Sequence, residues 1–333
     1  MHSFISRFSA LVPRRVVGML VAGLAGYLAC VWYTSKVNPQ TKLGLESSRI
    51  KTTWSARMGA TGKPKYVFFG GSSCGFSIDA ASLWRKHGLP AVNLGLSADM
   101  GTTVLTKYAF DHVRAGDTLV MALEPRLLEE IGEPPMFGIQ FSTLSHRLDW
   151  LDPVGGGPPF SRLEAFLNLR PGGYNLMTML GKVAARRPLY RYTIQDFDEA
   201  GWTRTQVRRP LAGAMLPPNA LTHEVRRYLL ALQEWCRDHH VRLVYSLPWG
   251  YVPTDQAPSF RKASAGFLLC ILEFMPALKD PSLGARSNPG EFADTPIHLT
   301  EESARVRTEL IAQQLASNAV WTADELSQLA RSH

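Results

Sequence analysis

The sequence is poor in cysteine and has neither a phosphate-binding glycine loop nor a basic repeat. Its four cysteines lack the spacing of a metal site and do not make a disulfide framework. No Walker-type loop or internal repeat is present, and the 36 lysine and arginine residues are scattered along the chain. We therefore expect no metal, no organic cofactor and no nucleic-acid partner.

The charge balance is basic, with a formal net charge of +8 at pH 7. Such a surface suits an anionic membrane or an anionic glycan, although scattered, solvated side chains explain the excess equally well. Among the cysteines, Cys74 adjoins a serine-rich turn and is expected to pack in the core. Cys236 and Cys270 could pair in an oxidising compartment, and the sequence leaves their separation open.

One long apolar run lies near the N-terminus. Residues 16–33 carry no charge and are about long enough to cross the hydrocarbon core of a bilayer. Arg14 and Arg15 precede the run, and residues 1–15 contain no acidic side chain, so the positive-inside rule keeps this end in the cytoplasm. We expect a cytoplasmic N-terminus at 1–15 and a single transmembrane anchor at 16–35 of the inner (cytoplasmic) membrane, with the remainder periplasmic or extracellular.

Two other fates of this run stay open. A cleaved signal peptide would need a small-residue cleavage site, and no clear A-x-A site follows the apolar core. A lipid anchor on Cys30 would need a lipobox, and Tyr27 and Leu28 fit its preceding positions poorly.

Apolar strand patterns and amphipathic helix patterns alternate on both sides of an irregular middle section. The expected strands are 66–70, 90–94, 119–123, 241–247 and 276–278, and the expected helices are 79–87, 102–114, 223–239, 260–275 and 300–315. This alternation predicts an α/β protein, a three-layer sandwich with a mostly parallel, flavodoxin-like sheet.

The same patterns suggest the domain boundaries. Residues 36–64 read as a linker with one short helix, 65–320 as the α/β domain, and 321–333 as a C-terminal helix or tail. The section 125–218 is rich in glycine and proline and interrupts the domain. We interpret it as an insertion that forms a cap or substrate-binding wall over the carboxyl edge of the sheet, while a surface excursion without a ligand role fits equally.

Two aromatic residues follow the fourth expected strand. Trp249 and Tyr251 could stack on a sugar ring, or they could plug the end of the core.

Two short segments carry the residues with the clearest chemistry. The first expected strand opens the segment YVFFGGSSCGFSID. The tight glycine turn that follows the strand can hold the hydroxyl of Ser72 at the open end of a sheet. Far downstream, FADTPIHLT places Asp294 four residues before His298, just ahead of a helix. A serine, a histidine and an acid are the nucleophile, the base and the orienting group of a hydrolytic triad.

These motifs resemble the SGNH, or GDSL-like, hydrolase superfamily over roughly residues 60–130 and 220–318. Gly70-Gly71-Ser72 is similar to its Gly-x-Ser nucleophile motif, and the pair Asp294 and His298 to its C-terminal acid and base. Asn93-Leu94-Gly95 corresponds to the block that supplies an oxyanion donor. The resemblance implies Ser72, His298 and Asp294 as catalytic residues. It also implies oxyanion or substrate binding by Gly71, Gly95, Asn93 and Ser73, with the backbone N–H groups of Ser72 and Gly95 as donors.

The chain departs from the family pattern in two places. The usual spacing is Asp-x-x-His, and here one more residue separates Asp294 from His298. The family also offers an Asn side chain after the third strand, where this chain has Glu124. An anion cannot stabilise an oxyanion, so either another donor completes the hole or hydrolysis is slowed, on the order of a hundredfold or more.

A rival interpretation uses the same serine-rich turn. The pattern G-x-S-x-G at 71–75 matches the nucleophile elbow of α/β-hydrolases and would make Ser73 the nucleophile. That elbow normally follows several earlier strands, which favours Ser72. A glycine- and serine-rich turn that merely ends a strand is the third interpretation.

The resemblance is to membrane-anchored members associated with O-acylation of cell-surface polymers. It implies a serine esterase or O-acyltransferase that acts on acyl esters of a cell-envelope glycan or polymer, beside a multi-spanning membrane O-acyltransferase. The alternative is a non-catalytic scaffold or glycan-binding subunit of a polysaccharide-modification complex, which the loss of the Asn donor favours.

Overall fold

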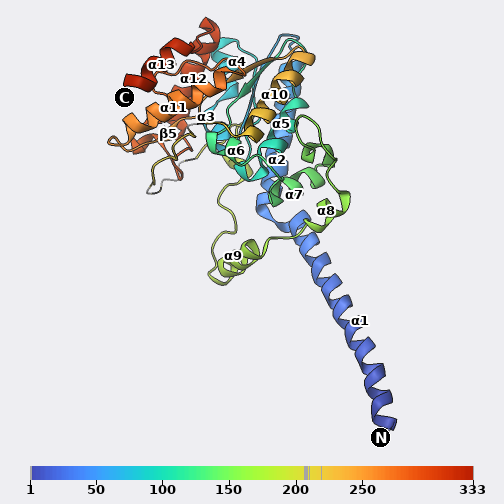
Figure 1. Ribbon diagram of the computed structural model, residues 1–333. Coiled ribbons are helices and arrows are strands. Elements are labelled where there is room, and N and C mark those ends of the chain that lie inside the picture. Colours follow the sequence, from blue (N-terminus) through green and yellow to red (C-terminus); the bar gives the residue numbers. More distant parts are fainter. Residues whose placement is uncertain (1, 206–208, 210, 219, 333) are drawn as a thin grey trace.

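A computed structural model describes residues 2–205, 209, 211–218 and 220–332. It shows an α/β domain carried on one long helix, α1 (His2–Trp32), which projects away from the rest of the chain (Figure 1). The stretch Arg15–Val37 is long and apolar enough to span a membrane, and none of its most apolar window is buried against the domain. The prediction of an N-terminal apolar helix of spanning length is therefore confirmed.

The helix continues into the domain with almost no interruption. A π-helical turn, η1 (Tyr33–Val37), and the single residue Asn38 join α1 to α2 (Pro39–Gly59). Asn38 caps α2 through its side chain, which accepts from the Gln40 N–H. The expectation of a linker at 36–64 was wrong, because α2 packs on the sheet and buries Trp54 and Met58 in the main core.

The central sheet is parallel, as the strand and helix alternation predicts. It contains β1 (Tyr66–Phe69), β2 (Ala91–Asn93), β3 (Thr118–Met121) and β4 (Arg242–Tyr245) in the order β2-β1-β3-β4. The expected strand at 276–278 is reduced to one parallel bridge between Tyr245 and Ala277. The fold is thus α/β with a mostly parallel sheet.

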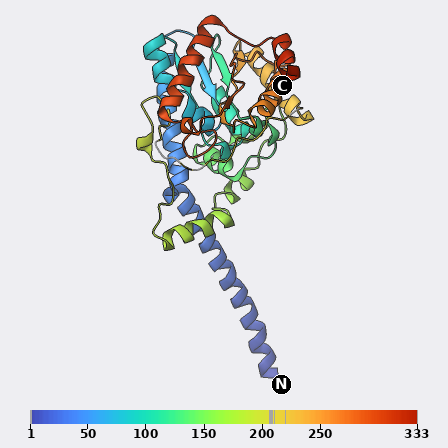
Figure 2. The ribbon, with the colours of Figure 1, turned by 90° about the vertical axis from the view of Figure 1, so that its left-hand side faces the viewer.

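Helices cover both faces of this sheet (Figures 1 and 2). They are α4 (Ala80–His87), α5 (Thr102–Phe110), α10 (His223–Asp238), α11 (Ala257–Leu272), α12 (Glu301–Ser317) and α13 (Ala323–Ser332). Asp79 caps α4 and Thr300 caps α12, as expected from the sequence, because each side chain accepts from a backbone N–H in the first turn of its helix.

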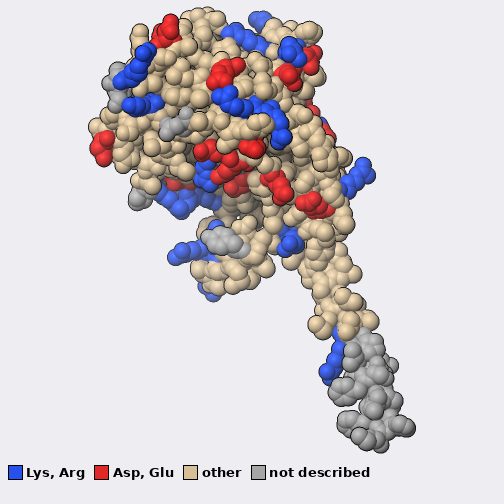
Figure 3. All heavy atoms as spheres, viewed as in Figure 1, with Lys and Arg blue, Asp and Glu red and all other residues tan. Residues whose placement is uncertain are grey.

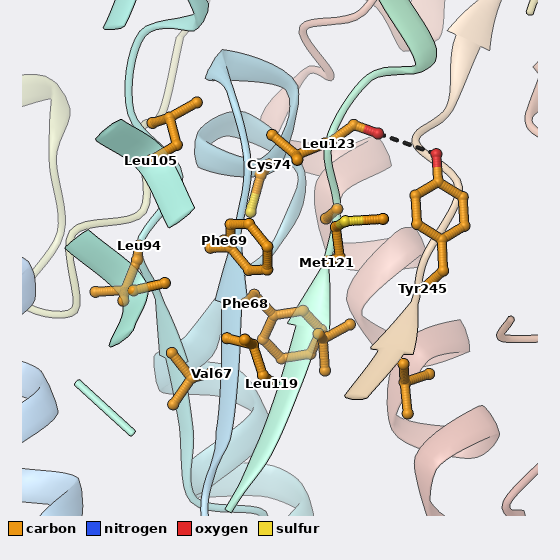
Figure 4. Packing of buried hydrophobic residues seen from close by; sticks show 14 of the residues in the cluster. Val67, Phe68, Phe69, Cys74, Leu94, Leu105, Leu119, Met121, Leu123 and Tyr245 are labelled. Atoms are coloured by element: carbon orange, nitrogen blue, oxygen red, sulfur yellow. Dashed lines mark hydrogen bonds between the residues drawn. The ribbon is translucent and has the colours of Figure 1, made fainter. Parts of the chain in front are cut away.

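Large apolar side chains of the strands fill the space between the layers. Phe68, Phe69, Leu119 and Met121 are completely buried and lie together in Figure 4. The Tyr245 hydroxyl donates to the Leu123 carbonyl oxygen at 3.0 Å, which ties β4 to the end of β3. This core fixes the carboxyl ends of β1 and β3 side by side.

The section 125–218 contains several short helices rather than one structureless loop. These are α6 (Pro125–Glu129), α7 (Met136–Leu144), η3 (Leu148–Leu151), α8 (Arg162–Leu167), α9 (Gly173–Ala184) and η4 (Ile194–Asp196). Phe141 of α7 and Trp150 of η3 join the main core beside Tyr108. The first half of the insertion therefore belongs to the folded domain, whereas α9 projects below it (Figure 1).

Three smaller elements complete the carboxyl side of the sheet. The strands β5 (Gly250–Tyr251) and β6 (Ala285–Arg286) form a separate two-stranded sheet, followed by the turn η5 (Pro289–Glu291). Trp249 is buried and donates to Asp280, so it plugs the end of the core.

All four cysteines are free, so Cys236 and Cys270 do not form the disulfide that the sequence left open.

Candidate active site

The serine-rich turn lies at the point where the order of the strands in the sheet reverses direction. The chain leaves β1 toward β2 on one side, and returns to place β3 on the other side of β1. Ligands of open α/β sheets bind at such a switch point, outside the carboxyl ends of the strands. The segment after β1 forms the short helix α3 (Ser72–Ser77), and Glu124 lies just after β3, at the start of α6.

The two candidate nucleophiles have different surroundings. Ser72 is partly exposed and lines a cavity of about 290 Å³. Ser73 is completely buried, and its hydroxyl has no hydrogen-bond partner among the described residues. A substrate in this cavity would therefore meet Ser72 and not Ser73.

The acid and the base lie on a tight loop that precedes α12. The Ala293 N–H donates to the His298 carbonyl oxygen at 2.8 Å, and Phe292 and Leu299 form an antiparallel bridge just outside it. Within the loop, the imidazole Nδ1 of His298 lies 2.9 Å from Oδ1 of Asp294. The additional residue between the acid and the base is thus absorbed by the turn, and the pair still forms.

Two residues of the insertion complete the surroundings of Asp294. Its Oδ2 accepts hydrogen bonds from the Tyr192 hydroxyl at 2.5 Å and from Arg191 Nη1 at 2.6 Å. Burial by itself would raise the pKa of the Asp294 carboxyl, but the hydrogen bonds from His298 and Tyr192 and the charge of Arg191 outweigh it and lower that pKa to about 2. Asp294 is therefore ionised at neutral pH and holds an Nδ1–H of His298, which leaves Nε2 as the proton acceptor.

Phe76 links His298 to the helix that carries Ser72. Its ring stacks on His298 with 4.1 Å between centroids and an angle of 10° between planes. Phe76 lies four residues after Ser72 on α3, so the two side chains share one face of that helix. Ser72 and His298 accordingly line the same cavity, although no hydrogen bond joins their side chains in the described structure. Catalytic hydrogen bonds are often long before substrate binds.

Glu124, where the resemblance would place an oxyanion donor, contacts the serine-rich turn in a way that the sequence does not show. Its Oε1 accepts from the Ser73 N–H at 3.0 Å, while its Oε2 is buried without a partner among the described residues. A Cβ on Gly71 would lie 2.5 Å from that oxygen. Gly71 is therefore the residue that lets the carboxylate approach the turn, and its backbone angles do not require glycine.

Asn93 and Gly95 are buried and hold α3 by hydrogen bonds and close backbone packing. The Asn93 side chain donates to the carbonyl oxygens of Cys74 and Ile78 and accepts from the Gly95 N–H at 2.9 Å. A Cβ on Gly95 would lie 2.3 Å from the backbone nitrogen of Gly75, so only glycine allows this approach. Gly95 lines the cavity, but its N–H is already occupied by Asn93 and is not free to meet an oxyanion in this arrangement.

A second, larger cavity of about 850 Å³ adjoins the first one. The two share Asp99, Phe137, Tyr190 and Ile297 in their walls. The larger cavity also reaches Glu124 on one side and the start of α2 on the other. Substrate could therefore extend from the Ser72 cavity toward the segment that follows the apolar helix.

A buried lysine supports the site from behind. Lys51 of α2 is completely buried, and its ammonium donates to the carbonyl oxygens of Asn93 at 2.9 Å and Gly201 at 2.5 Å. Burial lowers the pKa of Lys51 to about 8, against the opposing effects of Cys74 and Asp198. The Lys51 side chain thus links Asn93, at the end of β2, to Gly201 in the insertion.

Several of these residues were not predicted from the sequence. Arg191 and Tyr192 lie in the irregular insertion, where only the run RRPLYRY of basic and aromatic residues hinted at a role. Phe76 carries no distinguishing signal within the motif, and Lys51 lies in the segment that was expected to be a linker. In the described residues, no cluster of three or more His, Cys, Asp or Glu side chains is arranged to hold a metal.

Comparison of the chain with protein families, curated proteins and solved structures finds no significant match. No family is assigned. The geometry of Ser72, His298 and Asp294 is therefore the basis for a functional assignment.

Proposed function

We propose that the protein is a serine esterase or O-acyltransferase of SGNH type. The observation that carries this proposal is the convergence of three groups at the carboxyl edge of the sheet. Ser72 and His298 line one cavity, and Asp294 bonds the far nitrogen of the imidazole. Segments more than 200 residues apart in the sequence supply these groups, which argues against a chance turn.

The chemistry is acyl transfer in two steps. The Ser72 Oγ attacks the carbonyl carbon of an ester while His298 Nε2 takes the hydroxyl proton, and Asp294 stabilises the imidazolium that forms. The imidazolium then gives this proton to the departing alcohol, which leaves the acyl group on Ser72. In the second step an acceptor hydroxyl attacks the acyl-enzyme, His298 takes the acceptor's proton and returns it to Ser72. Water as the acceptor makes the protein an esterase, and a polymer hydroxyl makes it a transferase.

The arrangement of donors predicts a weak hydrolase. The N–H groups of Gly95 and Ser73 are engaged by Asn93 and Glu124, and the Glu124 carboxylate lies beside the turn that bears the nucleophile. The Ser72 N–H is then the remaining donor of those expected, and Gly95 would have to leave Asn93 before it could contribute. Loss of one donor slows acyl transfer on the order of a hundredfold.

This same observation favours the second candidate, a scaffold or glycan-binding subunit that keeps the shape of the site without turnover. The cavity would then hold an acyl or sugar group between Ser72 and His298 without bond cleavage. Activity measurements separate the two functions.

The location and partners belong to the proposal as well. We place Arg15–Val37 in the inner membrane with the N-terminus in the cytoplasm and the α/β domain outside, because Arg7, Arg14 and Arg15 precede the apolar run. An acyl acceptor there would be a cell-envelope glycan or polymer, and the acyl donor could come from a multi-spanning O-acyltransferase. The polymer acceptor and the acyl-donor partner derive from the motif resemblance, whereas the location derives from the apolar run and the arginines before it.

The test uses the full chain in detergent with a fluorophosphonate probe and with p-nitrophenyl acetate. We expect the probe to label the native chain and to label Ser73→Ala equally, whereas Ser72→Ala should lose labelling altogether. Labelling that survives Ser72→Ala but not Ser73→Ala would move the nucleophile to the neighbouring serine. Absence of labelling in a chain with a native unfolding transition would favour the scaffold.

A further inference from the structure

Two helices of the insertion expose apolar side chains beside the long helix. Each helix presents three large apolar residues that are between 46% and 69% exposed. They are Leu163, Phe166 and Leu167 on α8, and Met177, Leu180 and Val183 on α9. On α8 the second and third residues follow the first by three and four positions, and on α9 the residues are three apart, so each set forms one face of its helix. Clustered exposure of this kind marks a surface that contacts a membrane or another molecule.

The helix α8 touches α1 inside the segment that is apolar enough to span a membrane. The Tyr27 hydroxyl donates to the Phe166 carbonyl oxygen at 2.5 Å, and the two rings meet edge to face with centroids 5.6 Å apart. Tyr27 precedes Tyr33 by six residues, which corresponds to about 9 Å of helix. Interfacial helices bury their apolar faces to about 5–10 Å below the headgroups. This contact therefore places α8 at the depth of an interfacial helix.

The helix α9 has two unlike faces. Asn175, Thr178 and Met179 line the larger cavity, whereas Leu180 and Val183 point away from it. At 3.6 residues per turn, the cavity-lining set and the exposed apolar set lie on roughly opposite sides of the helix. Both views show α9 level with the end of α1 that is nearest the domain, and below the rest of the domain (Figures 1 and 2).

Basic side chains accompany this apolar surface. Arg170 follows α8, and Arg186 and Arg187 follow α9, all of them exposed. Figure 3 shows basic groups at the level of α9 above the uncharged length of α1. Glu164 is the acidic residue of α8, and it lies outside the apolar triplet of that helix. Arginines at the headgroup level favour anionic lipids.

We propose that the apolar faces of α8 and α9 form a membrane-binding surface, which inserts beside α1 into the leaflet on the side of the folded domain. The occupant of this surface is the lipid bilayer, with anionic headgroups at the arginines. The inference depends on the proposed membrane location of α1 but not on the proposed chemistry.

The surface has a consequence for substrate access. With α9 lying in the bilayer surface, its other face makes a wall of the 850 Å³ cavity, whose lining also includes Tyr33 at the end of the apolar helix. The cavity then reaches the level of the membrane surface at Tyr33, and it adjoins the Ser72 cavity. It suits a substrate whose apolar part stays in the lipid while its ester reaches Ser72.

Nitroxide labels on the full chain test the surface. The background replaces the partly exposed Cys30 and Cys270 by alanine and keeps the buried Cys74 and Cys236. One variant carries Leu180→Cys, and the protein is reconstituted in vesicles of mixed phosphatidylcholine and phosphatidylglycerol. Collisions of the label with oxygen, which concentrates in lipid, are compared with collisions with a water-soluble nickel chelate. We expect the ratio of oxygen to nickel collisions at Leu180→Cys to exceed several-fold the ratio at a control position.

Two controls separate the outcomes. Val306→Cys on α12 is a matched label, because Val306 is an apolar residue 54% exposed on a helix far from α1 (Figure 1). Leu24→Cys reports α1 itself. A lipid-like ratio at Leu24 with a water-like ratio at Leu180 would overturn the membrane surface while leaving the anchor intact. Weak collisions with both reagents at Leu180 would show a protein contact and would also overturn it. A water-like ratio at Leu24 would overturn the anchor and the surface together, with the serine chemistry untouched.

Discussion

The sheet core and the insertion at 125–218 contribute to the candidate site in different ways. The core holds Ser72 and His298 on short, buried segments whose glycines and caps leave little freedom. The insertion contributes Arg191 and Tyr192, which bond only the acid. In the proposed chemistry the scaffold thus supplies the reacting groups, while the inserted segment adjusts and covers them. Substitutions in the two regions should therefore differ in magnitude.

The largest effect is expected for the base. His298→Gln removes the proton acceptor, so p-nitrophenyl acetate hydrolysis should fall on the order of a thousandfold or more. His239→Gln is the matched control, because His239 is exposed at the end of α10 and lines neither cavity. Equal rates for native protein and His298→Gln would show that His298 does not act as the base.

A smaller loss, on the order of a hundredfold or more, is expected for Asp294→Asn, since the imidazole loses its charged partner.

The low pKa of Asp294, about 2, also predicts a pH effect on stability. The unfolded chain binds this proton near pH 4, so the contribution of the ionised carboxyl is complete above about pH 4 and is lost as the pH falls toward about 2. Acid titration of thermal unfolding should show a shallower decline for Asp294→Asn than for native protein. Parallel curves would mean that the carboxyl is not stabilised in the folded state.

For the insertion, Tyr192→Phe should reduce hydrolysis by about tenfold, because one hydrogen bond to a charged group is worth about 1.5 kcal/mol. Tyr190→Phe is the control, since its ring contacts Tyr192 while its hydroxyl does not bond Asp294. A loss as large as that of His298→Gln would erase the distinction between scaffold and insertion.

The smallest effect on activity is expected for Lys51→Met, which loosens the tie between the two regions. Two buried carbonyl groups lose their donor, so the free energy of unfolding should fall by about 1–3 kcal/mol at neutral pH. The native chain should also gain stability as the pH rises from about 8 to about 10, because the folded lysine releases a proton that the unfolded chain retains. Urea unfolding across this range should show the gain in native protein and its loss in Lys51→Met. A gain that persists in the variant would assign it to another group.

Much of the core could be predicted from local patterns. Short apolar runs and amphipathic periods gave β1 to β4 and the helices around them, because burial on a parallel sheet leaves a strong periodic signal. Asp79 and Thr300 were recognisable caps because each is a short acceptor side chain directly before an amphipathic helix. The segment at 276–278 failed as a strand because its apolar composition is also that of a buried extended segment with a single bridge.

The misses lie where tertiary contacts override the local sequence. The polar helix α2 looked like a linker because the partners of Lys51, the carbonyl groups of Asn93 and Gly201, are distant in sequence. The engagement of the Gly95 N–H by Asn93 could not be read from the motif either, because hydrogen-bond direction depends on coordinates. The pairing of Asp294 with His298 was predictable because both residues lie on one short loop.

The junction at η1 and Asn38 has a mechanical consequence. A glycine- and serine-rich tether would let a domain sweep through a volume above its anchor, but here one non-helical residue separates the long helix from a helix clamped to the sheet. The domain is therefore held at one distance from the long helix and in one orientation relative to it. In the proposed function, a polymer substrate must then be brought to the domain.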